Sequence, residues 1–146
     1  MKSVAQILKS KEEQIVATVS PASSVREAAA LMAEYGIGAL LVVDGERIVG
    51  IVSERDFARK LVAHDRSSGD TRVAEIMTSP VMYVGATHTN EDCMALMTSS
   101  RLRHLPVLEQ GKLLGLVSIG DLVKDVISDQ QFTIEQLEHY IMGTHT

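Results

Sequence analysis

A stretch of the form Gly-x-x-Ser-x-x-Asp, with a Ser and an Asp three residues apart, occurs twice in the sequence. The stretch GIVSERD contains Ser53 and Asp56, and the stretch GLVSIGD contains Ser118 and Asp121. An ionised Asp accepts two hydrogen bonds, which suits the neighbouring hydroxyls of a ribose, and a Ser hydroxyl can assist at ribose or phosphate. The same spacing is that of a helix N-cap, with Ser as the cap and Asp near the positive end. The spacing predicts either capping alone or capping combined with a binding site.

A glycine precedes the aliphatic pair in both stretches, at Gly50 and Gly115. Helix capping alone does not require a glycine there. Backbone N–H groups of a helix that begins at the edge of a sheet favour anions. We therefore interpret the repeated stretch as a binding motif with the cap built into the same residues.

The elements that must position these residues are duplicated too, since residues 16–62 align with residues 81–127 without a gap. Each copy predicts the order strand, helix, strand, strand, helix, and so a mixed α/β (α+β) fold whose two repeats share a core. The first copy comprises an extended segment at 14–20, a helix after the capping box Ser24–Glu27, strands at 39–43 and 47–53 and a helix from about Ser53. The second comprises an extended segment at 81–85, a helix after Thr89–Asp92, two strands around Gln110-Gly111 and a helix from about Ser118.

A separate amphipathic helix is expected at the C-terminus. The segment from Phe132 to Leu137 combines a capping box at Thr133 with an apolar staple, and Ile134 and Ile141 lie on one face with Leu137. This face is expected to pack on its own domain or on a second subunit. The predicted domains are residues 1–65 (first repeat with an N-terminal helix), 66–130 (linker and second repeat) and 131–146 (C-terminal helix and tail).

Composition narrows the classes of function. Hydrophobic residues make up 45% of the chain and aromatic residues 3%, which predicts an aliphatic core and few platforms for base stacking. A net charge of −5 disfavours a nucleic-acid or anionic membrane surface. The single cysteine, Cys93, aligns with Ala28 and is expected to be a buried structural residue. The presence of only one cysteine and the absence of an apolar leader favour a cytoplasmic protein. No zinc-ligand spacing and no nucleophile or phosphate-loop motif is present.

With the order, the spacing and the duplication of GIVSERD and GLVSIGD, and with RLRHLPV before the second, the chain resembles a pair of cystathionine β-synthase (CBS) domains, or Bateman module, over roughly residues 4 to 127. The C-terminal FTIEQLEHYI resembles the small stand-alone proteins of this family. The resemblance implies two β-α-β-β-α repeats with pseudo-two-fold symmetry and two clefts for AMP, ADP, ATP, NAD or S-adenosylmethionine. It also implies a disc-like homodimer.

The resemblance assigns roles to particular residues. Ribose binding falls to Asp56, Asp121, Ser53 and Ser118. The adenine pockets would be formed by Thr18, Ile37, Gly38, Ala39, Tyr83 and Leu102, although Tyr83 could equally be an ordinary strand aromatic. Phosphate binding would fall to Arg55, Arg103 and His104, with Arg66 as a weaker candidate and solvated surface charge as the alternative for each Arg. Because the two repeats carry different basic residues, we expect unequal sites.

Three hypotheses follow for function. The leading one is a regulatory module that senses adenine nucleotides and acts on a protein that the sequence does not identify. The second is an interaction scaffold with vestigial clefts, and the third is a minor nucleotide hydrolase. Larger enzymes such as inosine monophosphate dehydrogenase carry a similar pair, but their barrel needs about 250 residues. We therefore expect no enzyme, no catalytic residue, no catalytic cofactor and no metal.

Overall fold

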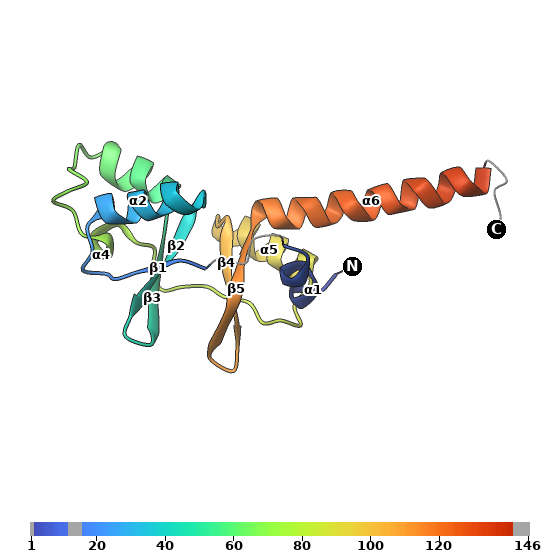
Figure 1. Ribbon diagram of the computed structural model, residues 1–146, viewed down its shortest axis with the longest axis horizontal. Coiled ribbons are helices and arrows are strands. Elements are labelled where there is room, and N and C mark those ends of the chain that lie inside the picture. The colour runs from blue at the N-terminus through green and yellow to red at the C-terminus, as the bar shows by residue number, and fades with distance from the viewer. Residues whose placement is uncertain (1, 12–15, 142–146) are drawn as a thin grey trace. The chain divides into compact units, whose positions relative to one another are not determined.

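The computed structural model describes residues 2–11 and 16–141 and divides into two compact units. Residues 15–82 form the first-repeat unit, and residues 1–14 and 83–146 form the second-repeat unit. Each unit contains one antiparallel hairpin, β2–β3 or β4–β5, with helices beside it (Figure 1). The predicted duplicated fold of mixed helices and strands is confirmed.

The first-repeat unit is built around a three-stranded sheet in the order β1-β2-β3. Strand β1 runs parallel to β2, and β2 runs antiparallel to β3. Its elements are β1 (Thr18–Val19), α2 (Val25–Tyr35), β2 (Ala39–Asp44), β3 (Arg47–Ser53), α3 (Glu54–Asp56), the π-helical turn η1 (Phe57–Val62) and α4 (Val73–Ile76). Of the predicted extended segment at 14–20, residues 16–20 are described, and they contain the two-residue strand β1.

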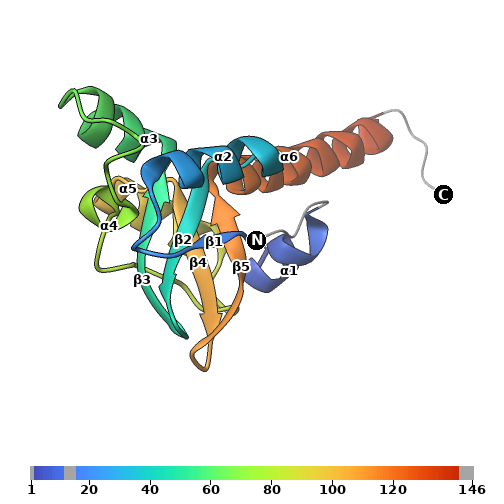
Figure 2. The ribbon, with the colours of Figure 1, turned by 60° about the vertical axis from the view of Figure 1, so that its left-hand side comes forward.

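The second-repeat unit follows the same plan. Strands β4 and β5 form an antiparallel pair, and Val84 adds a parallel bridge to Val107 where the first repeat has β1. Its elements are α1 (Val4–Ser10), α5 (Asn90–Ser100), β4 (His104–Glu109), β5 (Lys112–Ser118) and α6 (Ile119–Ile141). Figure 2 shows α1 beside β5.

The turn residues explain the two hairpins. Gln110 and Gly111 both have positive φ, at 50° and 78°, as a type I′ turn requires. Gly45 has φ of 65° in the first hairpin. The predicted helix caps are present as well, since Ser24 and Thr89 accept backbone N–H groups at the starts of α2 and α5.

The two cores are almost entirely aliphatic, as the composition predicts. The first-repeat core consists of Val19, Val25, Ala28, Met32, Leu40, Val42, Val52, Leu61, Val73 and Ile76. The second-repeat core consists of Val4, Ile7, Val84, Cys93, Met97, Leu105, Val107, Val117 and Leu122. Cys93 thus occupies the position that Ala28 holds in the other repeat.

The short helices that precede each repeat differ from the predicted division of the chain. Residues 1–65 were expected to hold the first repeat with its N-terminal helix, whereas α1 belongs to the second-repeat unit and residues 66–82 belong to the first-repeat unit. The reason is burial: Val4 and Ile7 of α1 complete the second core, and Val73 and Ile76 of α4 complete the first.

Helix α6 runs without interruption from Ile119 to Ile141, which corrects the prediction of a separate helix in 131–146. Thr133 does not cap a new helix, because its Oγ1 donates to the Asp129 carbonyl oxygen at 3.0 Å, one turn earlier. No Pro or Gly lies between Asp121 and Ile141 to end the helix.

Candidate functional site

The two Ser–Asp motifs form helix caps at the ends of β3 and β5. Asp56 Oδ2 accepts the Ser53 N–H at 2.9 Å, and Ser53 Oγ accepts the Asp56 N–H at 3.4 Å. In the second repeat, Asp121 Oδ2 accepts the Ser118 N–H at 2.8 Å, and Ser118 Oγ accepts the Asp121 N–H at 3.2 Å. The capping half of the prediction is therefore confirmed in both copies.

Each cap lies against the beginning of the neighbouring strand. In the first-repeat unit, Ala39 pairs with Ser53, and the N–H of Glu54 donates to the Gly38 carbonyl at 3.1 Å. The structure therefore brings the predicted segment 37–39 together with the first motif. This corner of the unit carries backbone groups, a hydroxyl and a carboxylate side by side.

The second-repeat unit has the same arrangement. His104 pairs with Ser118, and the N–H of Ile119 donates to the Arg103 carbonyl at 2.9 Å. The segment 102–104 therefore meets the second motif. Among the other predicted adenine-pocket residues, Thr18 pairs with Leu41 in the first-repeat sheet, and the exposed Tyr83 precedes the bridge residue of the second.

The motif glycines have a packing explanation. A Cβ on Gly50 would lie 2.5 Å from Met77 Sδ and 3.2 Å from the Thr78 carbonyl oxygen. A Cβ on Gly115 would lie 2.9 Å from Leu8 Cδ2. The segment at α4 or α1 thus approaches the strand at that point in both repeats. This close approach corrects the argument that the glycines by themselves indicate a binding motif.

Asp56 is engaged by a lysine four residues later, in the π-helical turn η1. Lys60 Nζ lies 3.1 Å from Asp56 Oδ1 and donates to the Ile76 carbonyl oxygen at 3.0 Å. The Thr78 hydroxyl donates to the same carboxylate oxygen at 3.2 Å. Asp56 is buried, with 8% of its surface exposed, and both of its carboxylate oxygens accept contacts from the protein.

Asp121 is engaged by a lysine from another part of the second-repeat unit. Lys11, just after α1, places Nζ 2.9 Å from Asp121 Oδ2 and 2.8 Å from the Leu116 carbonyl oxygen. Sequence reasoning missed both lysines, because the position equivalent to Lys60 is Asp125 and Lys11 lies outside the aligned repeats. Within the described residues, the contacts of Asp121 all involve Oδ2, which leaves Oδ1 for a ligand hydroxyl.

The predicted phosphate-binding residues have different surroundings. Arg66 pairs with Glu75, whose pKa is lowered by the backbone N–H of Arg72 and then by this guanidinium. Burial lowers the pKa of His104. The positive charges of Lys11 and Arg103 lower this pKa further, whereas the negative charge of Asp121 raises it. Arg55 lies inside the first motif, between Ser53 and Asp56, and its convergence with Arg103 and His104 stays a prediction.

A thiol role for Cys93 has no support in its surroundings. Cys93 is fully buried in the second-repeat core, and burial together with the charge of Asp92 raises the pKa of its thiol to about 11. It is a small core residue, as predicted. Residues 2–11 and 16–141 also contain no group of three or more His, Cys, Asp or Glu side chains that could hold a metal ion.

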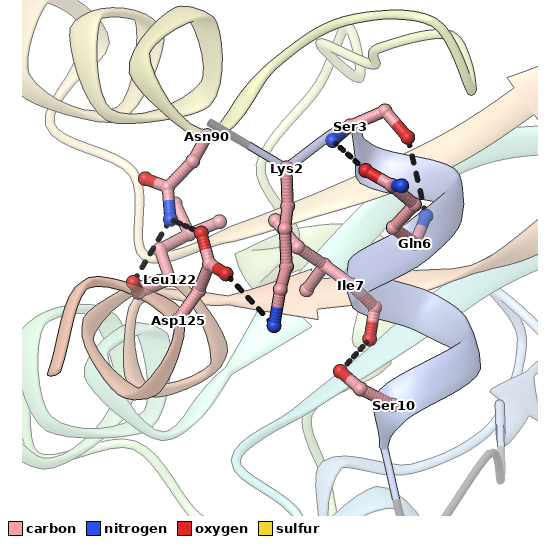
Figure 3. A network of polar contacts seen from close by, with 8 residues as sticks. All are labelled: Lys2, Ser3, Gln6, Ile7, Ser10, Asn90, Leu122 and Asp125. Atoms are coloured by element: carbon pink, nitrogen blue, oxygen red, sulfur yellow. Dashed lines mark hydrogen bonds and ion pairs between the residues drawn. The ribbon is translucent and has the colours of Figure 1, made fainter. Parts of the chain in front are cut away.

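A buried polar network in the second-repeat unit was not predicted (Figure 3). Asn90 Nδ2 donates to Asp125 Oδ2 at 2.7 Å and to the Leu122 carbonyl at 2.9 Å. Lys2 Nζ lies 3.5 Å from Asp125 Oδ1, and the Lys2 carbonyl accepts the Asn90 N–H at 3.2 Å. The signal in the sequence was a polar residue, Asn90, aligned with the core residue Val25. The network joins α5, α6 and the N-terminal segment.

The CBS domain family model matches this chain twice, at residues 12–63 and 73–128. The chain belongs to the CBS domain family. It is 36% identical over 125 residues to the CBS domain-containing protein CBSX3, mitochondrial, of Arabidopsis thaliana, covering 82% of this chain and 61% of that protein. The chain therefore spans less than two thirds of the length of this curated relative.

Solved structures agree with this assignment. A protein with CBS domains from Burkholderia ambifaria MC40-6 is 61% identical, with a TM-score of 0.86 over 91% of this chain and 99% of that chain. The CBS domain pair of protein MJ0100, in complex with 5′-methylthioadenosine and S-adenosyl-L-methionine, is 23% identical and has a TM-score of 0.77 over 88% of this chain and 98% of that chain. At that identity the likeness shows the fold alone. The predicted family and fold are confirmed. Separately, no helix among the described residues is both long and apolar enough to cross a membrane.

Proposed function

We propose that this CBS domain pair is a regulatory module that binds an adenosine-containing ligand, namely AMP, ADP, ATP, NAD or S-adenosylmethionine. The observation that carries the proposal is the repeated corner where a Ser–Asp cap meets the start of the adjacent strand. It supplies a carboxylate for ribose hydroxyls and backbone groups for a base edge. MJ0100, which shares this fold, holds two adenosine compounds, and this motivates the choice of ligands to test.

The residues have distinct proposed roles. Asp56 and Asp121 accept the ribose hydroxyls, with Ser53 and Ser118 beside them. Adenine rests against Thr18, Ile37, Gly38 and Ala39 in one site and against Tyr83 and Leu102 in the other. Arg55, Arg103 and His104 contact phosphate, and Arg66 does so only after leaving Glu75.

The second-repeat site is proposed to be the stronger one. Asp56 is buried and uses both carboxylate oxygens in protein contacts. Asp121 is less buried and uses only Oδ2 among the described contacts. A ribose hydroxyl can therefore reach Asp121 at a smaller cost in existing hydrogen bonds.

Regulation would follow from differential affinity. A ligand that binds one arrangement of the repeats or subunits more tightly shifts the population toward it. The proposal includes a homodimer and a regulated partner protein, and no role in nucleic-acid binding, membrane association or catalysis. It also includes a cytoplasmic location, for which the single cysteine is the support.

Calorimetry of ligand-free protein with AMP, ATP, NAD and S-adenosylmethionine tests the proposal. We expect saturable binding of at least one compound, and loss of binding in the double variant Asp56→Asn, Asp121→Asn. Asp44→Asn, on the exposed hairpin, is the matched control. If none of the compounds gives a heat of binding, the sensor hypothesis is rejected in favour of an interaction scaffold. Chromatography of the mixtures addresses the third hypothesis, because a new nucleotide product would identify a hydrolase.

A further inference from the structure

The C-terminal half of α6 presents a row of large apolar side chains to solvent. All side chains from residue 127 to 141 are exposed, and this half extends beyond α1, α5 and the strands of its own unit in both ribbon views (Figures 1 and 2). Between 44% and 79% of the surface is exposed for Val123, Ile127, Ile134, Leu137 and Ile141. A helical segment of this length has little stability without packing, so this row needs a partner.

The spacing of the row is that of a coiled-coil seam. Ile127, Ile134 and Ile141 repeat every seven residues, and Val123, Gln130 and Leu137 repeat every seven residues between them. In heptad terms, β-branched Ile occupies the a positions, and Val123, Gln130 and Leu137 occupy the d positions. Ile at a with Leu at d is the pattern of two-stranded coiled coils, and the polar Gln130 is the one departure from an apolar seam. The face is therefore shaped to receive another helix with the same seam.

The charges beside the seam permit a second copy of this chain. The charged residues at the flanking e and g positions from 123 to 141 are Lys124 and Glu138, which have opposite signs. Both are e positions, and the g positions Val126, Thr133 and Tyr140 are uncharged, so the e–g′ pairs of two parallel copies contain no like charges. Such charges are the usual means of rejecting a partner.

The exposed area also suits an association of two copies. At about 200 Å² for a fully exposed large side chain, the five apolar residues present on the order of 500 Å² per copy. This is as large as the largest apolar patch on a typical monomer. Two copies would bury on the order of 1,000 Å², the lower limit for a specific interface.

We propose that the row Val123, Ile127, Ile134, Leu137 and Ile141 is a self-association surface that pairs α6 with α6 of a second copy. This inference deepens the proposed homodimer and assigns its contact surface. The row contains none of the proposed ligand-binding residues. The seam covers fewer than three heptads, so we expect dissociation in the micromolar range.

Sedimentation equilibrium over a range of protein concentrations tests the surface. Ile134→Glu and Leu137→Glu should each raise the dimer dissociation constant at least about tenfold, since each buries a charge in the seam. The matched control is Phe132→Glu, which changes a 63% exposed apolar residue on the same helix outside the row. It should change the constant less than about threefold.

Several outcomes would overturn the inference. These are a wild-type protein that stays monomeric at every concentration, seam variants that dimerise as wild type does, and a Phe132→Glu variant that dissociates as strongly as they do. Circular dichroism and thermal unfolding must show that the variants remain folded, as substitutions at exposed positions should. Amide exchange gives a second readout: protection of residues 127–141 should rise with protein concentration in wild type and not in Ile134→Glu.

Calorimetry of the monomeric variants separates this inference from the proposed function. Variants that lose dimerisation but still bind nucleotide would support both. Loss of nucleotide binding in wild type with intact dimerisation would reject only the sensor.

Discussion

At the scale of single residues, the structure assigns each motif carboxylate a lysine that the repeat alignment could not reveal. Lys60 and Lys11 come from different places in the chain, yet each contacts a motif Asp and a backbone carbonyl. The two repeats thus reach similar local electrostatics through unrelated residues. Aligning the two repeats finds residues at equivalent positions. It cannot find a role that residues at non-equivalent positions play in each repeat.

Removing these lysines should destabilise the protein. Lys60→Met and Lys11→Met each leave a carboxylate and a carbonyl with one donor fewer, which should cost about 1–2 kcal/mol of unfolding free energy. Urea denaturation measures this, with Lys112→Met as the control because Lys112 is exposed on the β4–β5 hairpin. A loss no larger than that of the control would show that the two ion pairs contribute nothing.

His104 should make stability depend on pH. Burial lowers its pKa in the folded protein below the ordinary value of about 6.5, so the unfolded chain binds the proton more readily. The stabilisation is therefore fully present above pH 6.5 and declines as the pH falls below it. Unfolding free energies between pH 7.5 and 5.5 should fall less steeply in His104→Gln than in wild type. Equal slopes would contradict this assignment.

At the scale of elements, the sequence predicted most of what local patterns determine. Caps at Ser24 and Thr89 and the turn at Gln110-Gly111 follow from residues close in sequence, and all were found. The interpretation of Gly50 and Gly115 as signs of a binding motif was wrong. The atoms that leave no room for a Cβ at these positions belong to segments distant from the strands in sequence. The continuity of α6 was missed because a capping-box pattern at Thr133 does not act as a cap where the preceding turns are already helical.

The packing of Leu8 on Gly115 can be tested by a double-mutant cycle. Gly115→Ala alone should destabilise the protein by about 1–3 kcal/mol, because its Cβ would overlap Leu8. In a Leu8→Ala background the same change should cost much less, since the overlapping atoms are gone. Thermal unfolding of the four proteins measures the coupling. An equal cost in both backgrounds would mean that the glycine is required for another reason.

At the scale of the whole molecule, the duplication and the family were evident from sequence, but the composition of each unit was not. Val4–Ser10 and Val73–Ile76 look alike, and nothing in their local patterns states which core each completes. The structure assigns α1 to the second-repeat unit and α4 to the first, so the second repeat is completed by a helix that precedes both repeats and the first by a helix that follows it in the chain. The sequence predicted the site residues that are duplicated in the two repeats. It did not predict the lysines of the site or the network at Asn90, because these depend on how segments distant in sequence pack together.

The account rests on the claim that the corner at Asp121 binds a nucleotide, and that it does so more strongly than the corner at Asp56. The most direct test is a calorimetric titration of Asp121→Asn and Asp56→Asn, each beside wild type, with whichever compound wild type binds. We expect Asp121→Asn to lose at least about tenfold in affinity and Asp56→Asn to lose less. Wild-type affinity in Asp121→Asn, from folded and ligand-free protein, would contradict the account.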